Sequence, residues 1–237
     1  MGCFQLFFLM IFPTFIQPLF NKFTPLPKGS LRSKIEALAA RLKFPLKKLF
    51  VVDGSRRSAH SNAYFYGFFG YKRIVIYDTL IEQSTEDEVL AVLAHELGHW
   101  YYNHVLVNLI TAQVQLFIIF YLFSLLTQLP SLFLEFGFGK EQPVLIGFLL
   151  FQFVFSPVDS VMTFFMNYMT RAKEFQADAF AKRLGYTEQL KNGLITLNKS
   201  NLSNVNPDYL YSMYHHSHPP LVQRYCFWCF INELTRI

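Results

Sequence analysis

Two histidines and a glutamate near the middle of the chain have the spacing of a zinc-hydrolase motif. They lie in His95-Glu96-Leu97-Gly98-His99, an H-E-x-x-H pattern. On a helix, this spacing places both imidazoles on one face, one turn apart, where they can bind the same tetrahedral zinc ion. Glu96 then lies beside the open coordination position and can take a proton from the attacking water. The alternative is a pair of partly buried histidines on a helix that faces the core.

The sequence around the motif carries the signals of a helix. Thr85 and Glu88 have the spacing of a capping box, which predicts a helix that starts near Glu86. Gly98 costs about 1 kcal/mol relative to alanine inside a helix, so we expect another element to pack closely against it. The sequence has no helix breaker between the motif and the apolar stretch that begins at Val105. One continuous helix is therefore predicted there.

A catalytic zinc ion usually has three protein ligands, so the motif needs a third. The candidates are the later histidine and acidic residues: His104, Glu135, Glu141, Asp159, Glu174, Asp178, Glu188, Asp208, His215, His216, His218 and Glu233. Topology favours Glu174, because a chain that crosses a membrane after the motif and crosses back by about Thr170 returns it to the motif's side. Asp178, one turn further on, can accept a hydrogen bond from a ligand imidazole. An exposed i, i+4 acidic pair is the alternative. Glu135 and Glu141 fall on the opposite side and are excluded.

Long apolar stretches predict a membrane protein. Residues 105–129 carry no charged side chain, and residues 143–170 carry only Asp159. A helix crosses a bilayer with about 20 mainly apolar residues, so both stretches are predicted to span it. Residues 1–21 are also uncharged and are predicted to form a partial or remnant membrane helix. Pro157 predicts a kink in the second span. Asp159 then faces protein or a water-filled cavity, or it caps the helix that restarts after the proline.

These stretches divide the chain into six segments. They are a partial membrane helix (1–21), the first half of the zinc core (22–104), a membrane helix (105–129), a loop (130–142), a kinked membrane helix (143–170) and the second half of the core (171–237). Four basic residues follow the second span within 171–183, whereas the loop carries only Lys140. This asymmetry predicts that the zinc site lies on the cytosolic side.

A small β element is predicted ahead of the motif helix. An amphipathic helix at 31–42 and a strand at 49–52 precede two aromatic and β-branched runs, 62–69 and 72–77, which are typical of a hairpin. The first run can offer an exposed edge to an extended peptide, with the Asn62 side chain bonding the peptide backbone. A purely structural hairpin is the alternative. The expected fold is a mainly α-helical membrane zincin with a small β-hairpin element, attached to a transmembrane helical bundle.

A histidine and an arginine near the C-terminal end are candidates for contacting the transition state. His218 precedes Pro219-Pro220, which would hold it on a rigid turn, and Arg224 follows nearby. A fixed imidazole or guanidinium can stabilise the negative charge of a tetrahedral intermediate. From spacing alone, a surface histidine cluster is the stronger interpretation.

The composition excludes several classes of protein. Of the 237 residues, 52% are hydrophobic and only 16% are charged, which excludes a disordered or all-polar binding chain. Cys3, Cys226 and Cys229 are too few for a disulfide-stapled domain, and the single C-x-x-C pair predicts no function. The net charge is +5, and the sequence has no cluster of basic residues within a nucleic-acid-binding motif, so no nucleic-acid partner is expected.

Taken together, these stretches make the sequence similar to the CAAX prenyl protease 1 family, the Ste24-type zinc metalloproteases. The resemblance runs from about residue 12 to residue 224. It rests on Pro18–Pro27, Ser58–Phe68 with its S-N-A-Y segment, His95–Trp100, Phe151–Pro157, Glu174–Phe180 with its E-F-Q-A-D segment, and His218–Pro220. The set is specific, whereas H-E-x-x-H alone is not.

The resemblance implies roles for the site residues. The two motif histidines and Glu174 would bind one zinc ion, with the motif glutamate as the general base. Asn62 would line the substrate strand, His218 would act on the transition state, and Arg224 would contact the substrate. Family members remove the C-terminal tripeptide from farnesylated or geranylgeranylated Cys-a-a-X proteins in the endoplasmic reticulum membrane, and some make a second, upstream cut.

The sequence also departs from the family pattern. Family enzymes have about seven membrane spans around a chamber, so we expect the missing helices to precede residue 1. After Arg224 the sequence no longer follows the family. Two other functions therefore stay open: a broad-specificity quality-control membrane metalloprotease, and a non-catalytic truncated isoform.

Overall fold

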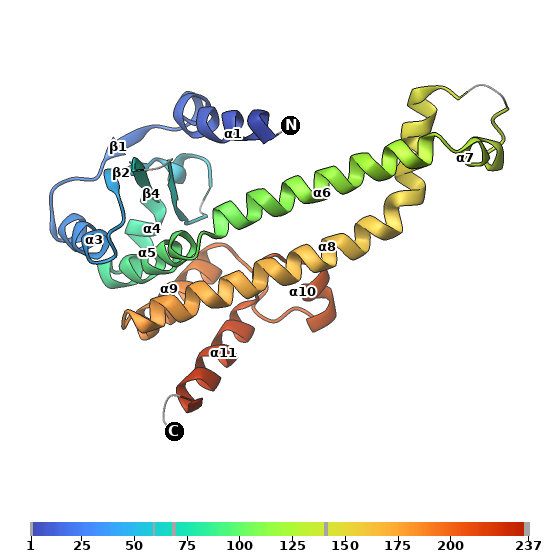
Figure 1. The fold of residues 1–237 in the computed structure, drawn as a ribbon. Coiled ribbons are helices and arrows are strands. Elements are labelled where there is room, and N and C mark those ends of the chain that lie inside the picture. Colours follow the sequence, from blue (N-terminus) through green and yellow to red (C-terminus); the bar gives the residue numbers. More distant parts are fainter. Residues whose placement is uncertain (1, 59, 68–69, 140–141, 235–237) are drawn as a thin grey trace.

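The computed structural model describes residues 2–58, 60–67, 70–139 and 142–234, which form a mainly helical protein with one small sheet (Figure 1). The elements in chain order are α1 Gly2–Ile11, a π-helical stretch Phe12–Ile16, α2 Gln17–Phe20, β1 Phe23–Pro25, α3 Ser30–Arg41, β2 Leu46–Val52, a 3-10 turn Gly54–Arg56, β3 Ala63–Tyr66, β4 Lys72–Tyr77, α4 Asp78–Gln83, α5 Glu86–Tyr101, α6 His104–Thr127, α7 Pro130–Glu135, α8 Val144–Arg183, α9 Thr187–Ser200, α10 Tyr209–His215 and α11 Leu221–Leu234.

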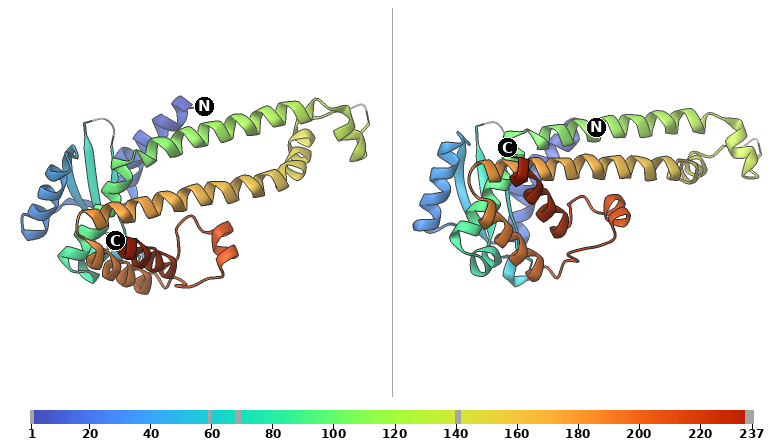
Figure 2. Two further views of the ribbon diagram at one scale, coloured as in Figure 1. Left: turned by 60° about the horizontal axis from the view of Figure 1, so that its bottom comes forward. Right: turned by 90° about the horizontal axis from the view of Figure 1, so that it is seen from below.

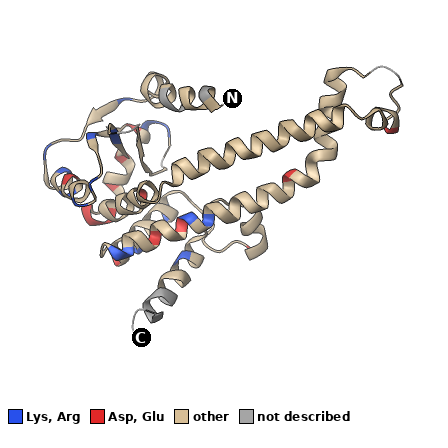
Figure 3. Ribbon diagram, in the orientation of Figure 1, with Lys and Arg blue, Asp and Glu red and all other residues tan. Residues whose placement is uncertain are grey.

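The molecule has a core end and an extended end. The sheet, α3, α4, α5 and α9 gather at one end, while α6 and α8 extend away from it and are connected through α7 at the far end (Figure 1). Both views in Figure 2 show α6 and α8 side by side. Charged residues gather at the core end, and α6 carries none (Figure 3). Residues 22–104 and residues 171–237 thus meet in one core, although the α6–α8 pair separates them in the chain.

The sheet is larger than the predicted hairpin. Its four strands are ordered β1-β2-β4-β3, with β2 parallel to β4 and both outer pairs antiparallel. The predicted hairpin is confirmed as β3 and β4, and β2 begins three residues earlier than expected. β1 was not predicted, because three residues that end at a proline give no alternating pattern. β3 lies at an edge of the sheet, next to α5.

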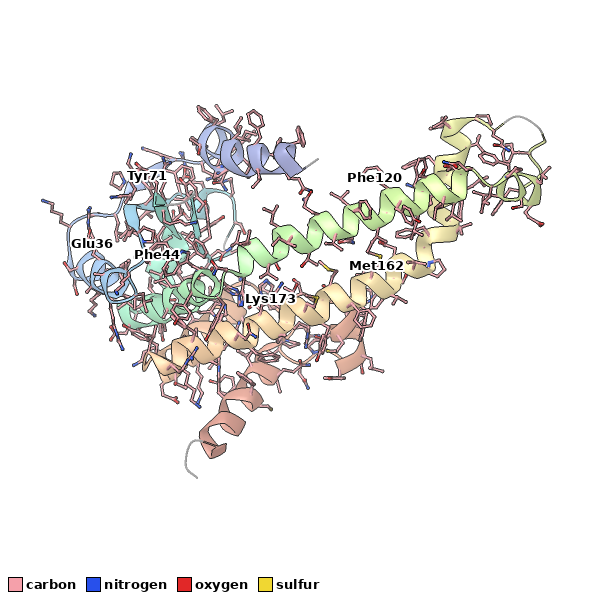
Figure 4. The ribbon with its side chains drawn as sticks, in the orientation of Figure 1. Glu36, Phe44, Tyr71, Phe120, Met162 and Lys173 are labelled. Atoms are coloured by element: carbon pink, nitrogen blue, oxygen red, sulfur yellow. The ribbon has the colours of Figure 1, made fainter. Side chains whose placement is uncertain are left out.

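The motif helix α5 begins where the sequence predicted. Thr85 accepts a hydrogen bond from the backbone of Glu88, whose side chain accepts one from the backbone of Thr85, so the capping box is confirmed. Most of α5 is buried in the core. Phe44, labelled in Figure 4, packs edge-on against Trp100 of this helix, with 5.0 Å between the ring centroids. The core therefore holds α5 along its length.

Gly98 of α5 lies against α8. A Cβ atom added there would lie 3.1 Å from the Cα of Ala177 and 3.2 Å from the Cβ of Phe180. The expected close packing against Gly98 is therefore confirmed. Only a residue without a side chain lets the two helix backbones approach this closely.

The helix break between α5 and α6 was not predicted. α5 ends at Tyr101, and Asn103 adopts a left-handed conformation with φ of 55° before α6 starts at His104. The expected continuous helix is therefore wrong. Asparagine is among the few residues that tolerate this conformation, but residue type alone does not show where it occurs.

The second long helix, α8, is continuous for 40 residues and contains Pro157. It bends in its first half, so the predicted kink is seen (Figure 1). No restart follows the proline, so the interpretation of Asp159 as a helix cap is wrong. Asp159 is exposed on the surface of this chain rather than packed against protein.

The connecting segment between the two long helices includes α7, where the sequence predicted only a loop. Glu135 ends α7 at the far end of the α6–α8 pair, away from α5 (Figure 1). Lys140 and Glu141 lie outside the described residues.

Candidate metal centre and active site

Two histidines of α5 point their Nε2 atoms at each other. The Nε2 atoms of His95 and His99 are 3.2 Å apart. His95 is buried and His99 is half-buried, as expected for a helix face that meets α8. The i, i+4 spacing therefore brings the two nitrogens to one point, as the sequence predicted.

Glu174 of α8 completes a group of three possible ligands. Its Oε2 lies 3.5 Å from Nε2 of His95, and its Oε1 lies 3.3 Å from Nε2 of His99. The side chain is buried, so the alternative of an exposed acidic pair does not hold. These are the three residues that the described part of the chain offers together as a metal-binding group.

The group has the chemistry and dimensions of a zinc site. Two imidazole nitrogens and one carboxylate form the His₂Glu set found in catalytic zinc sites. Ligands about 2.0–2.1 Å from a tetrahedral ion lie about 3.4 Å from one another. The two Nε2 atoms are 3.2 Å apart, and they lie 3.3 and 3.5 Å from the two different oxygens of the Glu174 carboxylate. These spacings are close to the expected value, so the residues present fit a single zinc ion.

Asp178 holds the first histidine in orientation. Nδ1 of His95 donates to Oδ1 of Asp178 over 2.9 Å, which leaves Nε2 free to face the centre. Asp178 is fully buried, and Nε of Arg224 donates to its Oδ2 over 2.8 Å. Burial alone would lower the pKa of His95, but hydrogen bonds to Asp178 and Glu174 raise it to about 9.

Arg224 is itself buried, and the Nε and Nη2 atoms of one edge of its guanidinium group both donate to Asp178. The structure thus places this arginine behind His95, as the partner of Asp178. Its predicted contact with a substrate stays a prediction.

Glu96, the proposed general base, lies one residue after the first ligand and is half-buried. Burial raises the pKa of Glu96 above its usual value, and the nearby positive charges of His95 and His99 oppose the rise. A base whose pKa lies nearer to neutral pH transfers protons more effectively.

His218 lies beside the ligands. Its Nδ1 is 3.0 Å from Oε2 of Glu174, while most of its side chain is exposed. The contact with Glu174 raises the pKa of His218. The interpretation as a surface cluster therefore fails for His218, because its ring reaches the centre. The neighbouring His215 and His216 line the polar pocket beside it.

The loop that carries His218 is attached to α8 by Arg171, a role that the sequence did not predict. Nη1 of Arg171 donates to the Ser212 carbonyl over 3.2 Å and to the Ser212 hydroxyl over 3.0 Å, and Nη2 donates to Gln223. The arginine is buried. In the sequence, Arg171 was only one of the four basic residues that follow the second span. Long-range hydrogen bonds leave no local pattern, so its role could not be predicted.

Asn62 lies just before the edge strand β3. Its Oδ1 accepts from the backbone N–H of Ala63 over 2.8 Å, and its carbonyl accepts from Tyr77 over 3.0 Å. Bonding alternates along an antiparallel pair, so the backbone N–H of Ala63 points away from β4, toward the open edge. β3 is therefore an edge strand with Asn62 at its start, and its own residues are buried or half-buried, so an exposed edge stays a prediction.

A second histidine contact was also missed. Nδ1 of His104 lies 2.9 Å from Nδ1 of His99, and Nε2 of His104 lies 3.0 Å from Oε1 of Gln176. His104 follows the unpredicted helix break, so a continuous helix could not reveal the contact. Lys173, labelled in Figure 4, donates to Asn108 at the same junction of α6 and α8.

Comparison with known proteins relates this site to one family. Residues 25–226 match the model of peptidase family M48. The chain is 57% identical to the CAAX prenyl protease 1 homolog of Oryza sativa subsp. japonica over 93% of this chain and 52% of that protein. It is 45% identical to the Homo sapiens homolog, over 93% of this chain and 54% of that protein. The chain thus spans about half the length of the curated relatives it matches.

The structure agrees with a solved relative. The crystal structure of S. mikatae Ste24p matches with a TM-score of 0.85 and 47% identity, over 95% of this chain and 55% of that chain. The chain's relatives that are 45–57% identical are named CAAX prenyl protease 1 homolog, and the chain itself belongs to peptidase family M48.

Proposed function

We propose that this chain is a zinc-dependent membrane endopeptidase that removes the C-terminal tripeptide from prenylated Cys-a-a-X proteins. One observation carries the proposal: two imidazole nitrogens of α5 and the two oxygens of one α8 carboxylate come together at contacts of 3.2–3.5 Å, with Glu96 on the same turn of α5. Relatives that are 45–57% identical and named CAAX prenyl protease 1 support the substrate class.

His95, His99 and Glu174 would hold the zinc ion. When bound, zinc supplies a Lewis acid that polarises the scissile carbonyl and makes water more acidic. Asp178 fixes His95 through Nδ1, so the ligand nitrogen keeps its direction while substrates enter and leave.

Glu96 would take the proton of the attacking water on its carboxylate and pass it to the leaving amine. Burial raises the pKa of Glu96, which makes its carboxylate a stronger acceptor for the proton of the water. His218 would donate a hydrogen bond to the oxygen on which negative charge develops. Its position on the turn before Pro219, beside Glu174, supports this role.

The substrate would bind as an added strand along β3. This strand is an edge of the sheet and lies next to α5, so a peptide paired with it passes the metal centre. Asn62 would release the Ala63 N–H and bond the peptide backbone instead.

We also propose that α6 and α8 cross the endoplasmic reticulum membrane, with the metal centre on its cytosolic side. Both helices are long and apolar enough to cross a membrane. α6 carries no charged residue, and apart from Asp159 the charged residues of α8 lie toward the core end, where they include Lys173, Lys182 and Arg183 (Figure 3). A centre at this boundary would meet lipid-anchored substrates.

The test compares three substrates with the full chain in membranes. A farnesylated Cys-a-a-X peptide is expected to lose its tripeptide at least tenfold faster than the same peptide without the farnesyl group, and than an unprenylated membrane polypeptide. Equal rates on all three would instead favour a quality-control protease. No cleavage by a folded, zinc-loaded chain would favour a non-catalytic role for these residues.

A further inference from the structure

His104 carries two hydrogen bonds that the proposed function does not use. One joins its Nδ1 to Nδ1 of His99 over 2.9 Å, and the other joins its Nε2 to Oε1 of Gln176 over 3.0 Å. The side chain is buried, at 4% exposure, and its ring stacks on Tyr102 with 5.6 Å between centroids. A buried imidazole with a partner on each nitrogen has one defined orientation.

The helix break at Asn103 creates this contact. In a continuous helix, residues five positions apart are rotated by about 140° and lie on different faces. The left-handed Asn103 ends α5 and starts α6 in a new direction, which returns His104 to the face of His99. The same break brings His104 to Gln176, two residues beyond the ligand Glu174 on α8.

The series of hydrogen bonds from His99 through His104 to Gln176 fixes the tautomer of both imidazole rings. A metal bound at Nε2 of His99 leaves the proton on Nδ1, which donates to Nδ1 of His104. The single proton of a neutral His104 is then on Nε2, and it donates to Oε1 of Gln176. Every donor in the series meets one acceptor.

His104 is thereby excluded as a metal ligand, although the sequence made it a candidate. Both of its nitrogens are occupied, and the metal-binding group of the described residues consists of His95, His99 and Glu174.

We infer that His104 is a positioning residue that orients the metal ligand His99, as Asp178 orients His95. The inference rests on the proposed metal site. The two ligands thus receive different supports: a carboxylate behind His95 and a neutral imidazole behind His99. Partners of this kind fix the ring and its tautomer, and losing one typically weakens metal binding 10–100-fold.

The test measures zinc affinity of the full chain in detergent micelles, by competition with a chelator. His104→Phe keeps a ring but removes the acceptor, and zinc binding is expected to weaken 10–100-fold. His104→Asn places an amide oxygen near the position of Nδ1, so the acceptor for His99 is kept. Its zinc affinity is expected to lie within about threefold of wild type, a smaller loss than that of one hydrogen bond to a charged group. Gln176→Met, at an exposed position, is expected to weaken binding about 2–10-fold, the value of one neutral hydrogen bond.

The control is His60→Phe, because His60 is exposed and its ring contacts Ser58 rather than a ligand. Unchanged zinc affinity in His104→Phe would overturn the inference while leaving the metal site intact. Equal losses in folded His104→Phe and His104→Asn would also overturn it, because the acceptor would then have no role. If His104→Phe does not fold, Gln176→Met decides, and an unchanged affinity there counts against the inference. A folded wild-type chain that binds no zinc would instead refute the metal site itself.

Discussion

Nδ1 of His95 donates to Oδ1 of Asp178 over 2.9 Å, and this bond joins residues 83 positions apart in the chain. His95 comes from the helix before the membrane-length pair, and Asp178 comes from the end of its second helix. The centre therefore needs residues from both 22–104 and 171–237, folded together in one core.

The ion pair behind His95 is expected to contribute to stability. Arg224→Met leaves the fully buried Asp178 carboxylate without its cation, which should lower the free energy of unfolding by about 3–5 kcal/mol. Asp178→Leu combined with Arg224→Met removes both charges and should recover only part of this loss, because buried Nδ1 of His95 then loses its acceptor. Denaturant titration of the three proteins checks the prediction. A single variant as stable as wild type would show that the pair has no structural role.

The contact at Gly98 predicts a difference between two identical substitutions. A Cβ at Gly98 would lie 3.1 Å from backbone of α8, whereas one at Gly193 in α9 would meet its nearest neighbours at 3.5 Å, an ordinary contact. Gly193→Ala should raise the unfolding free energy by up to about 1 kcal/mol. Gly98→Ala should be less stable than Gly193→Ala by about 1–3 kcal/mol, because it overpacks the helix crossing. Equal melting temperatures would contradict this account of the crossing.

His218 should affect turnover more than substrate binding. His218→Ala removes a donor proposed for the transition state, so kcat should fall about 100- to 1,000-fold while KM changes little. His215→Ala is the matched control, because that exposed histidine contacts Tyr211 and Tyr214 rather than Glu174. Steady-state kinetics on the farnesylated peptide separates the two parameters. A rise in KM at constant kcat would assign His218 to ground-state binding.

Asn62 should show the opposite pattern. Its side chain is proposed to bond the substrate backbone, so Asn62→Ala should raise KM about 2–10-fold, the value of one neutral hydrogen bond, with kcat nearly constant. The same kinetic assay checks it. A large fall in kcat without a change in KM would place Asn62 at the reacting atoms rather than along the bound strand.

Patterns in the sequence were enough to predict which three candidate ligands the structure brings together. The i, i+4 spacing of His95 and His99 fixes their common face, and the two apolar stretches return Glu174 to that face. The capping box at Thr85 fixes the start of the helix. Each of these follows from helical periodicity or from the length of a membrane span.

Long-range contacts could not be predicted in the same way. The left-handed Asn103 is one conformation among several that asparagine tolerates, so neither the break nor the contact between His99 and His104 was foreseen. The hydrogen bonds from Arg171 to Ser212 and Gln223 join segments that are distant in the chain, and no local sequence pattern predicts them. β1 is too short to show a period of two.

The most direct test is release of the tripeptide from a farnesylated Cys-a-a-X peptide by membranes that carry only this 237-residue chain. Zinc content is measured in parallel, and Glu96→Gln is the control, because it removes the base and keeps all three ligands. We expect release by the wild-type chain, a loss of about 100-fold or more in Glu96→Gln, and equal zinc content in both. Equal release by the two proteins, or no release by an inserted, zinc-loaded wild-type chain, would contradict the proposed function.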